Sequence, residues 1–135
     1  LFSGSMTLST KMINFLKGTK NIKLLIGPLI ISKEIKNLKK AKINYSLNKI
    51  NYFKTLSVAN RIYCKFGVST YEMILLGKKP IIFEENETLD RKKDIKYLFD
   101  NGLIQLIKNK KIVCKEKKIN LNIIKSLKNI INIIK

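Results

Sequence analysis

The residues that could do chemistry are concentrated in the stretch FGVSTYEMILLGKKPIIF, residues 66–83. Gly67 is followed by two hydroxyl residues, Ser69 and Thr70, and the carboxylate of Glu72 comes two positions after Thr70. Glycine lets backbone N–H groups approach a phosphate closely, and the first turn of a helix has N–H groups without helical acceptors. The stretch therefore predicts an anion site at a helix start, with a carboxylate beside it.

Glu72 allows two interpretations. In the first it is a structural acid in the first turn of a helix, where the helix dipole favours a carboxylate by roughly 0.3–1 kcal/mol. Ser69 and Glu72 have the spacing of a capping box, with Ser69 as the helix cap. In the second, the carboxylate faces a ligand crevice and accepts hydrogen bonds from a ribose diol. The sequence leaves both interpretations open.

A second loop of the same kind lies near the N-terminus, where GSMTLST places Gly4 and Ser5 directly after the expected end of a strand. Neither loop matches the dinucleotide-binding GxGxxG pattern or a P-loop. The alternative for each loop is structural, because glycine also ends strands and serine or threonine also caps helices. Either loop is suited to a nucleotide diphosphate, but for an isolated loop we favour the structural alternative.

The acidic cluster EENETLD follows the apolar run 80–83 and contains Glu84, Glu85, Glu87 and Asp90. Paired carboxylates can serve in acid–base catalysis or bind a metal ion. We favour the structural alternative, in which acids at a helix start offset the helix dipole and the surrounding lysine charge. Cys64 and Cys114 lie far apart and the chain has no histidine, so no zinc set is formed. We expect neither a metal nor a cofactor.

Short apolar runs alternate with segments of helical period along the chain. The expected strands are 1–3, as the end of a truncated strand, then 21–28, 41–45, 61–66, 80–83 and 103–107. The expected helices are a segment ending near residue 17, then 32–40, 51–60, 69–76, 90–101 and 119–135, with Gly77 and Gly102 closing the fourth and fifth. This alternation predicts an α/β fold: a single Rossmann-like domain, 1–135, with an open parallel sheet and helices on both faces.

The formal charge of +19 comes from 28 Lys and Arg against 9 Asp and Glu. It would suit nucleic acid, an anionic membrane surface or a polyanionic substrate. The lysines are dispersed among many Ile and Asn residues, whose codons are also AT-rich, so genomic composition explains much of the charge. The chain has only two arginines and no aromatic RNA-binding pattern. Specific nucleic-acid binding is therefore not expected, although a non-catalytic basic nucleic-acid-binding module stays an alternative.

No stretch reaches the roughly twenty apolar residues of a membrane span, and the N-terminus lacks the layout of a signal peptide. We therefore expect a soluble, cytoplasmic protein. In the favoured interpretation, the apolar stripe of the expected amphipathic helix at 119–135 packs on the sheet or on another domain. In the alternative it makes a peripheral contact with a membrane surface.

From residue 2 to about residue 107 the chain resembles the C-terminal, donor-binding half of GT-B nucleotide-sugar enzymes. The resemblance lies in FSGS after the first strand, IGP after the second, and S-T-x-E-x-x-x-x-G-x-x-P across residues 69–80. It is closest to the UDP-sugar hydrolases of pseudaminic acid biosynthesis and to glycosyltransferase family 28, which includes the lipid II-forming N-acetylglucosaminyltransferase. The resemblance implies one half of a GT-B architecture.

The resemblance also implies a role for each candidate residue in binding a UDP-sugar. The implied contacts to the diphosphate come from Gly4, Ser5, Gly67, Ser69 and Thr70. Glu72 is implied to bind the ribose, and Ser46 and Leu47 are implied to contact uracil. Asn86 is implied to lie near the sugar and the scissile bond, where it orients the sugar or a water molecule. The first loop departs from the family, since Ser3 and Met6 stand where relatives carry Gly and Asp.

GT-B enzymes place acceptor binding and a catalytic histidine on an N-terminal domain, and this chain has no histidine. The implied partner is therefore an N-terminal GT-B domain, in the same chain or a separate one. The favoured function is the donor half of a hydrolase of a UDP-linked diacetamido trideoxy sugar. The alternative is the donor domain of a UDP-GlcNAc-type glycosyltransferase. Glu85 and Glu87, read as exposed acids, would be poor bases, so the chain alone is expected to bind a UDP-sugar without turning it over.

Overall fold

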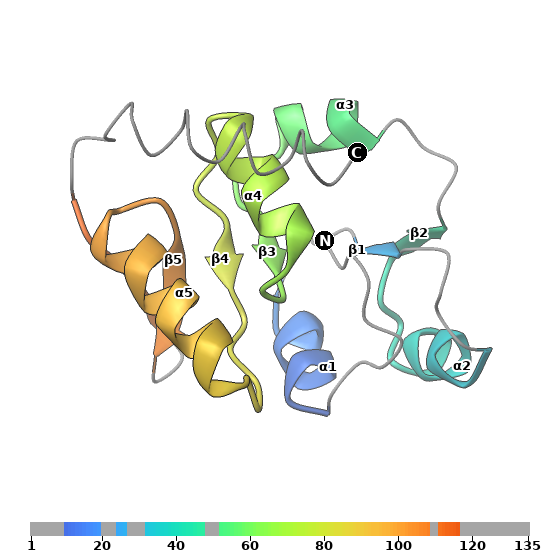
Figure 1. The fold of residues 1–135 in the computed structure, drawn as a ribbon. Coiled ribbons are helices and arrows are strands. Elements are labelled where there is room, and N and C mark those ends of the chain that lie inside the picture. Colours follow the sequence, from blue (N-terminus) through green and yellow to red (C-terminus); the bar gives the residue numbers. More distant parts are fainter. Residues whose placement is uncertain (1–9, 20–23, 27–31, 48–51, 109–110, 117–135) are drawn as a thin grey trace. The chain divides into compact units, whose positions relative to one another are not determined.

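The computed structural model describes residues 10–19, 24–26, 32–47, 52–108 and 111–116 (Figure 1). The expected strand at 1–3, the Gly4 and Ser5 loop and the expected helix at 119–135 lie outside these residues. Contacts divide the chain into two compact units, Leu1–Ala59 and Asn60–Lys135, where the sequence predicted one domain. No helix in the described ranges combines the length and the apolar character needed to cross a membrane.

The first unit alternates helices and short strands. Its elements are α1 (Thr10–Lys17), β1 (Leu24–Ile26), α2 (Ser32–Lys40), β2 (Tyr45–Leu47) and α3 (Tyr52–Val58). The two strands pair in parallel, as expected for strands joined through a helix. Met12 and Leu16, four residues apart on α1, are buried, as are Leu38 on α2 and Leu56 on α3. The strand predicted at 41–45 begins only at its last residue, Tyr45.

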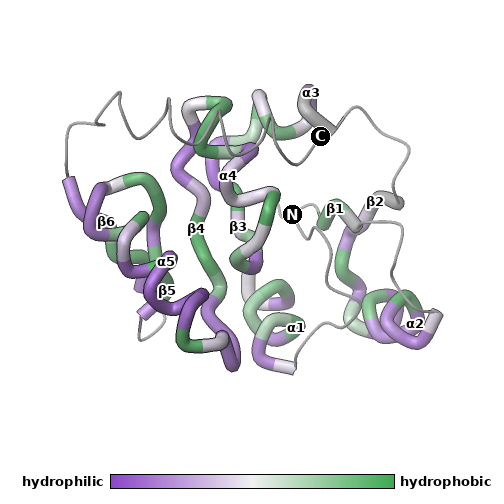
Figure 2. The backbone as a smooth tube through the Cα atoms, viewed as in Figure 1, coloured by the Kyte–Doolittle hydropathy of each residue, from purple (hydrophilic) through white to green (hydrophobic). Residues whose placement is uncertain are grey.

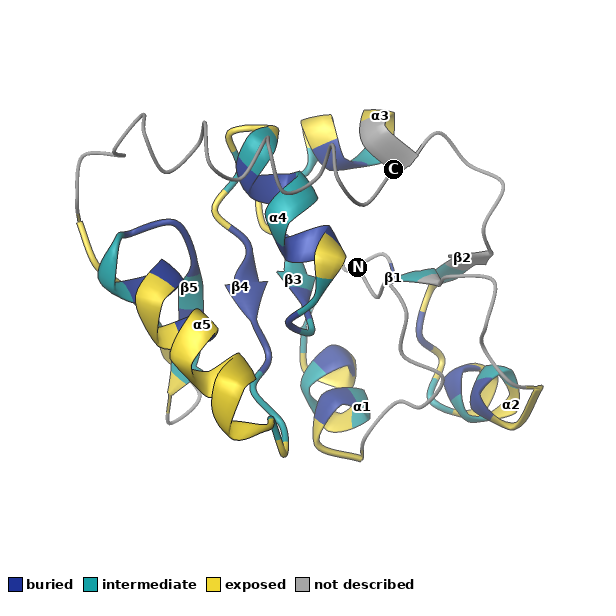
Figure 3. Ribbon diagram, viewed as in Figure 1, coloured by how far each residue is buried: buried dark blue, intermediate teal, exposed yellow. Residues whose placement is uncertain are grey.

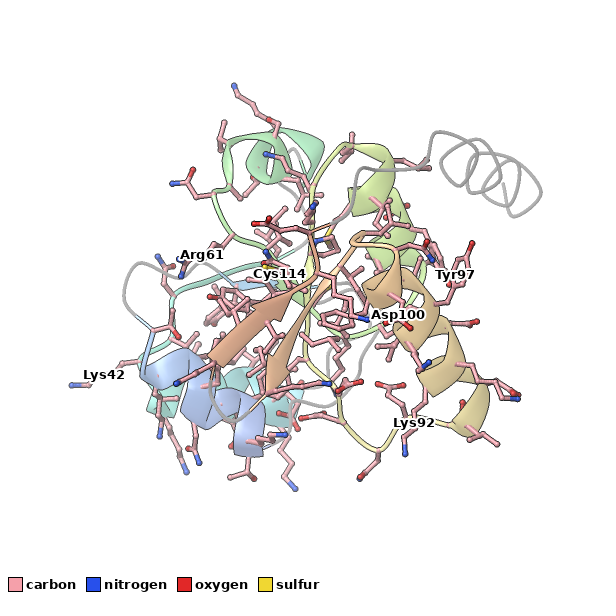
Figure 4. The ribbon with its side chains drawn as sticks, turned by 90° about the vertical axis from the view of Figure 1, so that its left-hand side faces the viewer. Lys42, Arg61, Lys92, Tyr97, Asp100 and Cys114 are labelled. Carbon is pink, nitrogen blue, oxygen red and sulfur yellow. The ribbon has the colours of Figure 1, made fainter. Side chains whose placement is uncertain are left out.

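In its described residues, the second unit is a four-stranded sheet with two helices. Its elements are β3 (Tyr63–Cys64), α4 (Val68–Leu75), β4 (Ile81–Ile82), α5 (Leu89–Asp100), β5 (Gln105–Lys108) and β6 (Lys111–Cys114). The strand order is β3-β4-β5-β6, and β3, β4 and β5 are parallel. Successive right-handed crossovers between adjacent parallel strands place both helices on one face of the sheet (Figures 1 and 4). Within this unit, the predicted coverage of both faces therefore does not occur among the described helices.

The prediction of an all-parallel sheet is wrong at its last strand. β6 pairs antiparallel with β5, from Gln105 opposite Cys114 to Lys108 opposite Lys111. The sequence analysis missed β6 altogether. Only two residues separate the strands, and the first, Asn109, is a residue that two-residue hairpins favour. The mixed α/β class and the open, mostly parallel sheet are confirmed.

The core of the second unit is the layer between β4 and the two helices. Ile81 and Ile82 are buried, and β4 is strongly hydrophobic (Figures 2 and 3), as a strand inside a parallel sheet must be. On α5, Ile95, Leu98 and Phe99 recur at helical spacing and are buried. The opposite side of α5 is exposed (Figure 3), and Tyr97 is 55% exposed and points away from the sheet in Figure 4.

Both helices of this unit end at the predicted glycines. Gly77 and Gly102 have φ of 72° and 69°, the left-handed conformation that costs glycine least. The backbone N–H of Lys78 donates to the Met73 carbonyl at 3.0 Å, and Gly77 donates to Ile74 at 3.0 Å, which together form a Schellman motif. These endings turn the chain back into β4 and β5.

Candidate functional site

The candidate site lies at the carboxyl edge of β3 and β4. Because these neighbouring strands are parallel, the chain leaves both of them at the same edge of the sheet, where open α/β sheets bind ligands. After β3 the chain passes through Gly67 into α4, and after β4 it passes through the acidic segment into α5. The two predicted groups of polar residues are thus brought to one edge.

The start of α4 is built differently from the prediction. Gly67, not Ser69, is the capping residue. The hydroxyl of Thr70 accepts a hydrogen bond from the Gly67 N–H at 3.2 Å, and the Thr70 N–H donates to the Gly67 carbonyl at 2.9 Å. Ser69 is the second residue of the helix and is buried. The predicted capping box of Ser69 and Glu72 is therefore wrong.

Glu72 is the fifth residue of α4 and lies beyond its first turn, which contains no acid. Its interpretation as a first-turn acid is therefore wrong as well, because the effect of the helix dipole falls off within that turn. Residues four apart share one face of a helix, so Glu72 lies on the same face as Val68. Val68 is 53% exposed and Glu72 is partly exposed, which leaves this carboxylate accessible along the outer side of the helix.

The space beside Gly67 is open. Among the described residues, no atom lies within 4 Å of a Cβ built on Gly67, and the φ of 171° at Gly67 is extended backbone that any residue adopts. No described residue accepts a hydrogen bond from the backbone N–H groups of Val68 and Ser69. N–H groups at a helix start that have no acceptor can donate hydrogen bonds to an anion.

Thr70 is fully buried, so its hydroxyl supports the turn from inside. The Cys64 Sγ lies 3.9 Å from the Thr70 Oγ1 behind the helix start. Burial raises the pKa of the Cys64 thiol to about 11, with a smaller opposing effect from its hydrogen bond to Thr70. At neutral pH this thiol is protonated, and it is not a nucleophile.

The segment after β4 is held by ion pairs. Lys65 Nζ lies 2.9 Å from Glu85 Oε2, and Arg91 Nη1 lies 3.4 Å from Glu87 Oε2. The side chains of Glu85 and Glu87 are only 17% and 8% exposed, so the prediction that these acids are exposed is wrong. Asn86 between them is exposed.

The predicted structural role of the acids at the start of α5 is confirmed in part. Asp90 lies in the first turn of α5, and the Thr88 hydroxyl caps the helix by accepting from the Arg91 N–H at 3.5 Å. Glu87 lies just before the helix, as predicted. In the described ranges, no three His, Cys, Asp or Glu side chains are grouped so that they could hold a metal ion.

Two of the candidate residues belong to the other unit. Ser46 and Leu47 form part of β2, where they pair with Leu25 and Ile26 of β1. Gly4 and Ser5 lie outside the described residues. The second unit therefore brings together Gly67, Ser69 and Thr70 at one helix start, Glu72 one turn further on, and Asn86 on the neighbouring loop.

Lys65 is the site residue that the sequence analysis missed. It follows the last residue of β3, and it is the lysine nearest in sequence to the start of α4. The signal was a charged residue inside the apolar run RIYCKF, at a position where a strand meets its loop. In a chain with so many lysines, that signal does not stand out.

The chain was compared with protein-family models, with curated proteins and with solved structures, and none of the three gave a match.

Proposed function

We propose that the chain binds a UDP-sugar as the donor half of a nucleotide-sugar hydrolase of the pseudaminic acid type. The observation that carries the proposal is the start of α4 at the carboxyl edge of two parallel strands, where the N–H groups of Val68 and Ser69, next to Gly67, have no acceptor among the described residues. The sequence resemblance supports a UDP-sugar as the ligand, and these N–H groups at the helix start support a phosphate contact there.

The diphosphate is assigned to the N–H groups of Val68 and Ser69. Thr70 has a different role from the one first expected, because its buried hydroxyl already accepts from Gly67. It fixes the turn that presents the neighbouring N–H groups.

The ribose is assigned to Glu72. The helix rises about 1.5 Å per residue, so Glu72 lies about 6 Å along the axis from Val68 and on the same face. This distance is similar to the length of the ribose that would lie between Glu72 and a phosphate at the helix start. The exposed amide of Asn86 is proposed to meet the sugar.

Catalysis is assigned to a partner domain. Glu85 and Glu87 are engaged with Lys65 and Arg91, and an asparagine side chain can orient a group but cannot take a proton. A histidine-bearing N-terminal GT-B domain, in the same or a separate chain, would supply the base. Glycosyl transfer would use the same donor site and differ in what that partner binds.

Calorimetry with UDP, UMP and inorganic diphosphate tests the proposal. UDP is expected to bind more tightly than either of the other two ligands, because ribose and diphosphate are held at separate points. Equal affinity for UDP and diphosphate would remove the ribose assignment. Duplex DNA is the control ligand for non-specific binding to the basic chain. Its affinity is expected to fall steeply as the salt concentration rises. DNA binding that persists at about 200 mM salt, together with no UDP binding, would overturn the proposal in favour of a nucleic-acid-binding module.

A further inference from the structure

One ion pair joins the two loops of the candidate site. Lys65 directly follows β3 and Glu85 stands three residues after the end of β4, and Nζ and Oε2 are 2.9 Å apart. The two side chains are 20% and 17% exposed, so most of each lies out of solvent. Such a pair is less screened by salt than a surface pair.

This ion pair links the chain after β3 to the chain after β4, beyond the backbone hydrogen bonds between the two strands. The Phe83 N–H donates to the Cys64 carbonyl at 2.8 Å, directly before Lys65. After that hydrogen bond the chains diverge, one toward α4 and the other toward α5. Lys65 and Glu85 hold the two loops together at the point where they separate.

The residue next to this pair is the exposed Asn86. Consecutive Cα atoms are 3.8 Å apart, so fixing Glu85 restricts where the Asn86 amide can lie. On the other side, Glu87 is paired with Arg91 of α5. Asn86 therefore stands between two ion-paired residues, which lowers the cost of ordering this loop when a ligand binds.

We propose that Lys65 is a positioning residue for the sugar of the UDP-sugar. Acting through Glu85, it sets the position of Asn86 relative to the start of α4, so it affects recognition of the sugar and leaves recognition of UDP unchanged. The inference rests on the proposed function, because it takes UDP to be held at α4. A pair with a merely structural role would alter folding stability and would not alter preference for the sugar.

The test uses UDP and UDP-N-acetylglucosamine as probes in calorimetry. The measured quantity is the sugar preference, the Kd for UDP divided by the Kd for UDP-N-acetylglucosamine. Lys65→Met and Glu85→Gln are each expected to lower it by about 3- to 10-fold, with the Kd for UDP changed by less than about twofold. The double variant is expected to resemble the single ones, because both remove one interaction.

Three further variants keep the test decisive. Lys65→Arg retains the charge and is expected to retain most of the sugar preference. The swapped pair, Lys65→Glu with Glu85→Lys, keeps opposite charges at the two positions and is expected to recover part of it, including where a single variant folds poorly. Lys93→Met removes the exposed Lys93–Asp90 pair on α5 and is the control, with no expected change.

The possible results separate the two proposals. A wild-type chain that binds neither probe overturns both the proposed function and this inference. A wild-type chain that binds UDP, with the same sugar preference in the wild type, Lys65→Met and Glu85→Gln, overturns the positioning role alone.

Discussion

The hydroxyl of Thr70 and the backbone N–H of Gly67 form the 3.2 Å hydrogen bond that closes the first turn of α4. Thr70 is fully buried and Gly67 is partly exposed, so this bond is partly shielded from competing water. It ties the residue that begins the helix to the third residue within it. The geometry of the candidate anion site depends on this turn.

Removing that bond is expected to destabilise the fold. Thr70→Val keeps the shape of the side chain but leaves the Gly67 N–H without its acceptor, which should lower the free energy of unfolding by about 1–2 kcal/mol. Thr70→Ser keeps the hydroxyl and is the matched control, with a smaller loss from the missing methyl group. Urea unfolding measures both variants. A Thr70→Val chain as stable as the wild type would show that the bond contributes little.

Gly67→Ala separates binding from folding. The extended φ and the open space at Gly67 accommodate a methyl group, so the free energy of unfolding should change by less than about 1 kcal/mol. The affinity for UDP should fall, because the methyl group occupies the space assigned to the phosphate.

Gly77→Ala is the control for that variant. With a φ of 72°, an alanine at this position is strained, so the chain should lose stability by about 1 kcal/mol or more while its affinity for UDP is kept. Calorimetry measures the affinity of both variants for UDP, and urea unfolding measures their stability. Unchanged UDP affinity in Gly67→Ala would move the phosphate away from this helix start.

Glu72→Gln tests the ribose assignment. The variant keeps the shape but loses the charge of the hydrogen-bond acceptor, so the affinity for UDP should fall by about 1.5–3 kcal/mol, while the affinity for inorganic diphosphate is unchanged. Folding stability should change by well under about 1 kcal/mol, because Glu72 is neither in the first turn nor buried. Glu116→Gln removes an exposed acid elsewhere and is the control for net charge. A large fall in stability with UDP binding intact would assign Glu72 a structural role.

The two cysteines are expected to differ in reactivity and in their effect on pH dependence. Cys114 is exposed and should react with a thiol reagent at pH 8, whereas Cys64 should react only after unfolding. Burial raises the pKa of Cys64 from 9.0 to about 11. A raised pKa means that the folded chain favours the protonated thiol, so this contribution to stability is complete below pH 9.0 and is lost as the pH rises toward 11. Mass spectrometry after labelling would contradict this arrangement if both thiols of the folded chain reacted at one rate.

The chain alone is expected to release no UDP from a UDP-sugar. It has no histidine, and Glu85 and Glu87 in the segment after β4 are ion-paired. General-base catalysis typically contributes about 10²–10⁴-fold, so its absence should leave turnover near the uncatalysed rate. A coupled assay for UDP with the purified chain measures this. Sustained release that disappears in Glu85→Gln or Glu87→Gln would place the base in this chain.

The features that the sequence predicted well were those set by local patterns. Helix spacing on α5 and the glycines after α4 and α5 depend on residues within a few positions of each other, and both were correct. Ser69 was wrongly predicted to cap α4, because serine and threonine are both residue types that commonly cap helices. What distinguishes them is the burial of Thr70 against Cys64, a contact that exists only once β3 and α4 have packed.

Two other features were missed for related reasons. Only Asn109 and Lys110 lie between β5 and β6, and asparagine and lysine are so frequent in the chain that they gave no distinct signal in the sequence. The pairing of Lys65 with Glu85 depends on the register between β3 and β4, which the sequence does not specify for strands this short. A contact that depends on how two strands align cannot be deduced from the order of residues within each strand.

The hairpin at the end of the sheet has a practical consequence for attaching the protein to other molecules. Because β6 runs antiparallel to β5, it returns Cys114 to the level of Gln105, at the edge where the parallel strands begin. The candidate site lies at the other edge, where β3 and β4 end. A fluorophore or a sensor surface coupled through Cys114 would therefore be carried on the far edge of this sheet, and binding could be followed on a chain whose ligand edge is left clear.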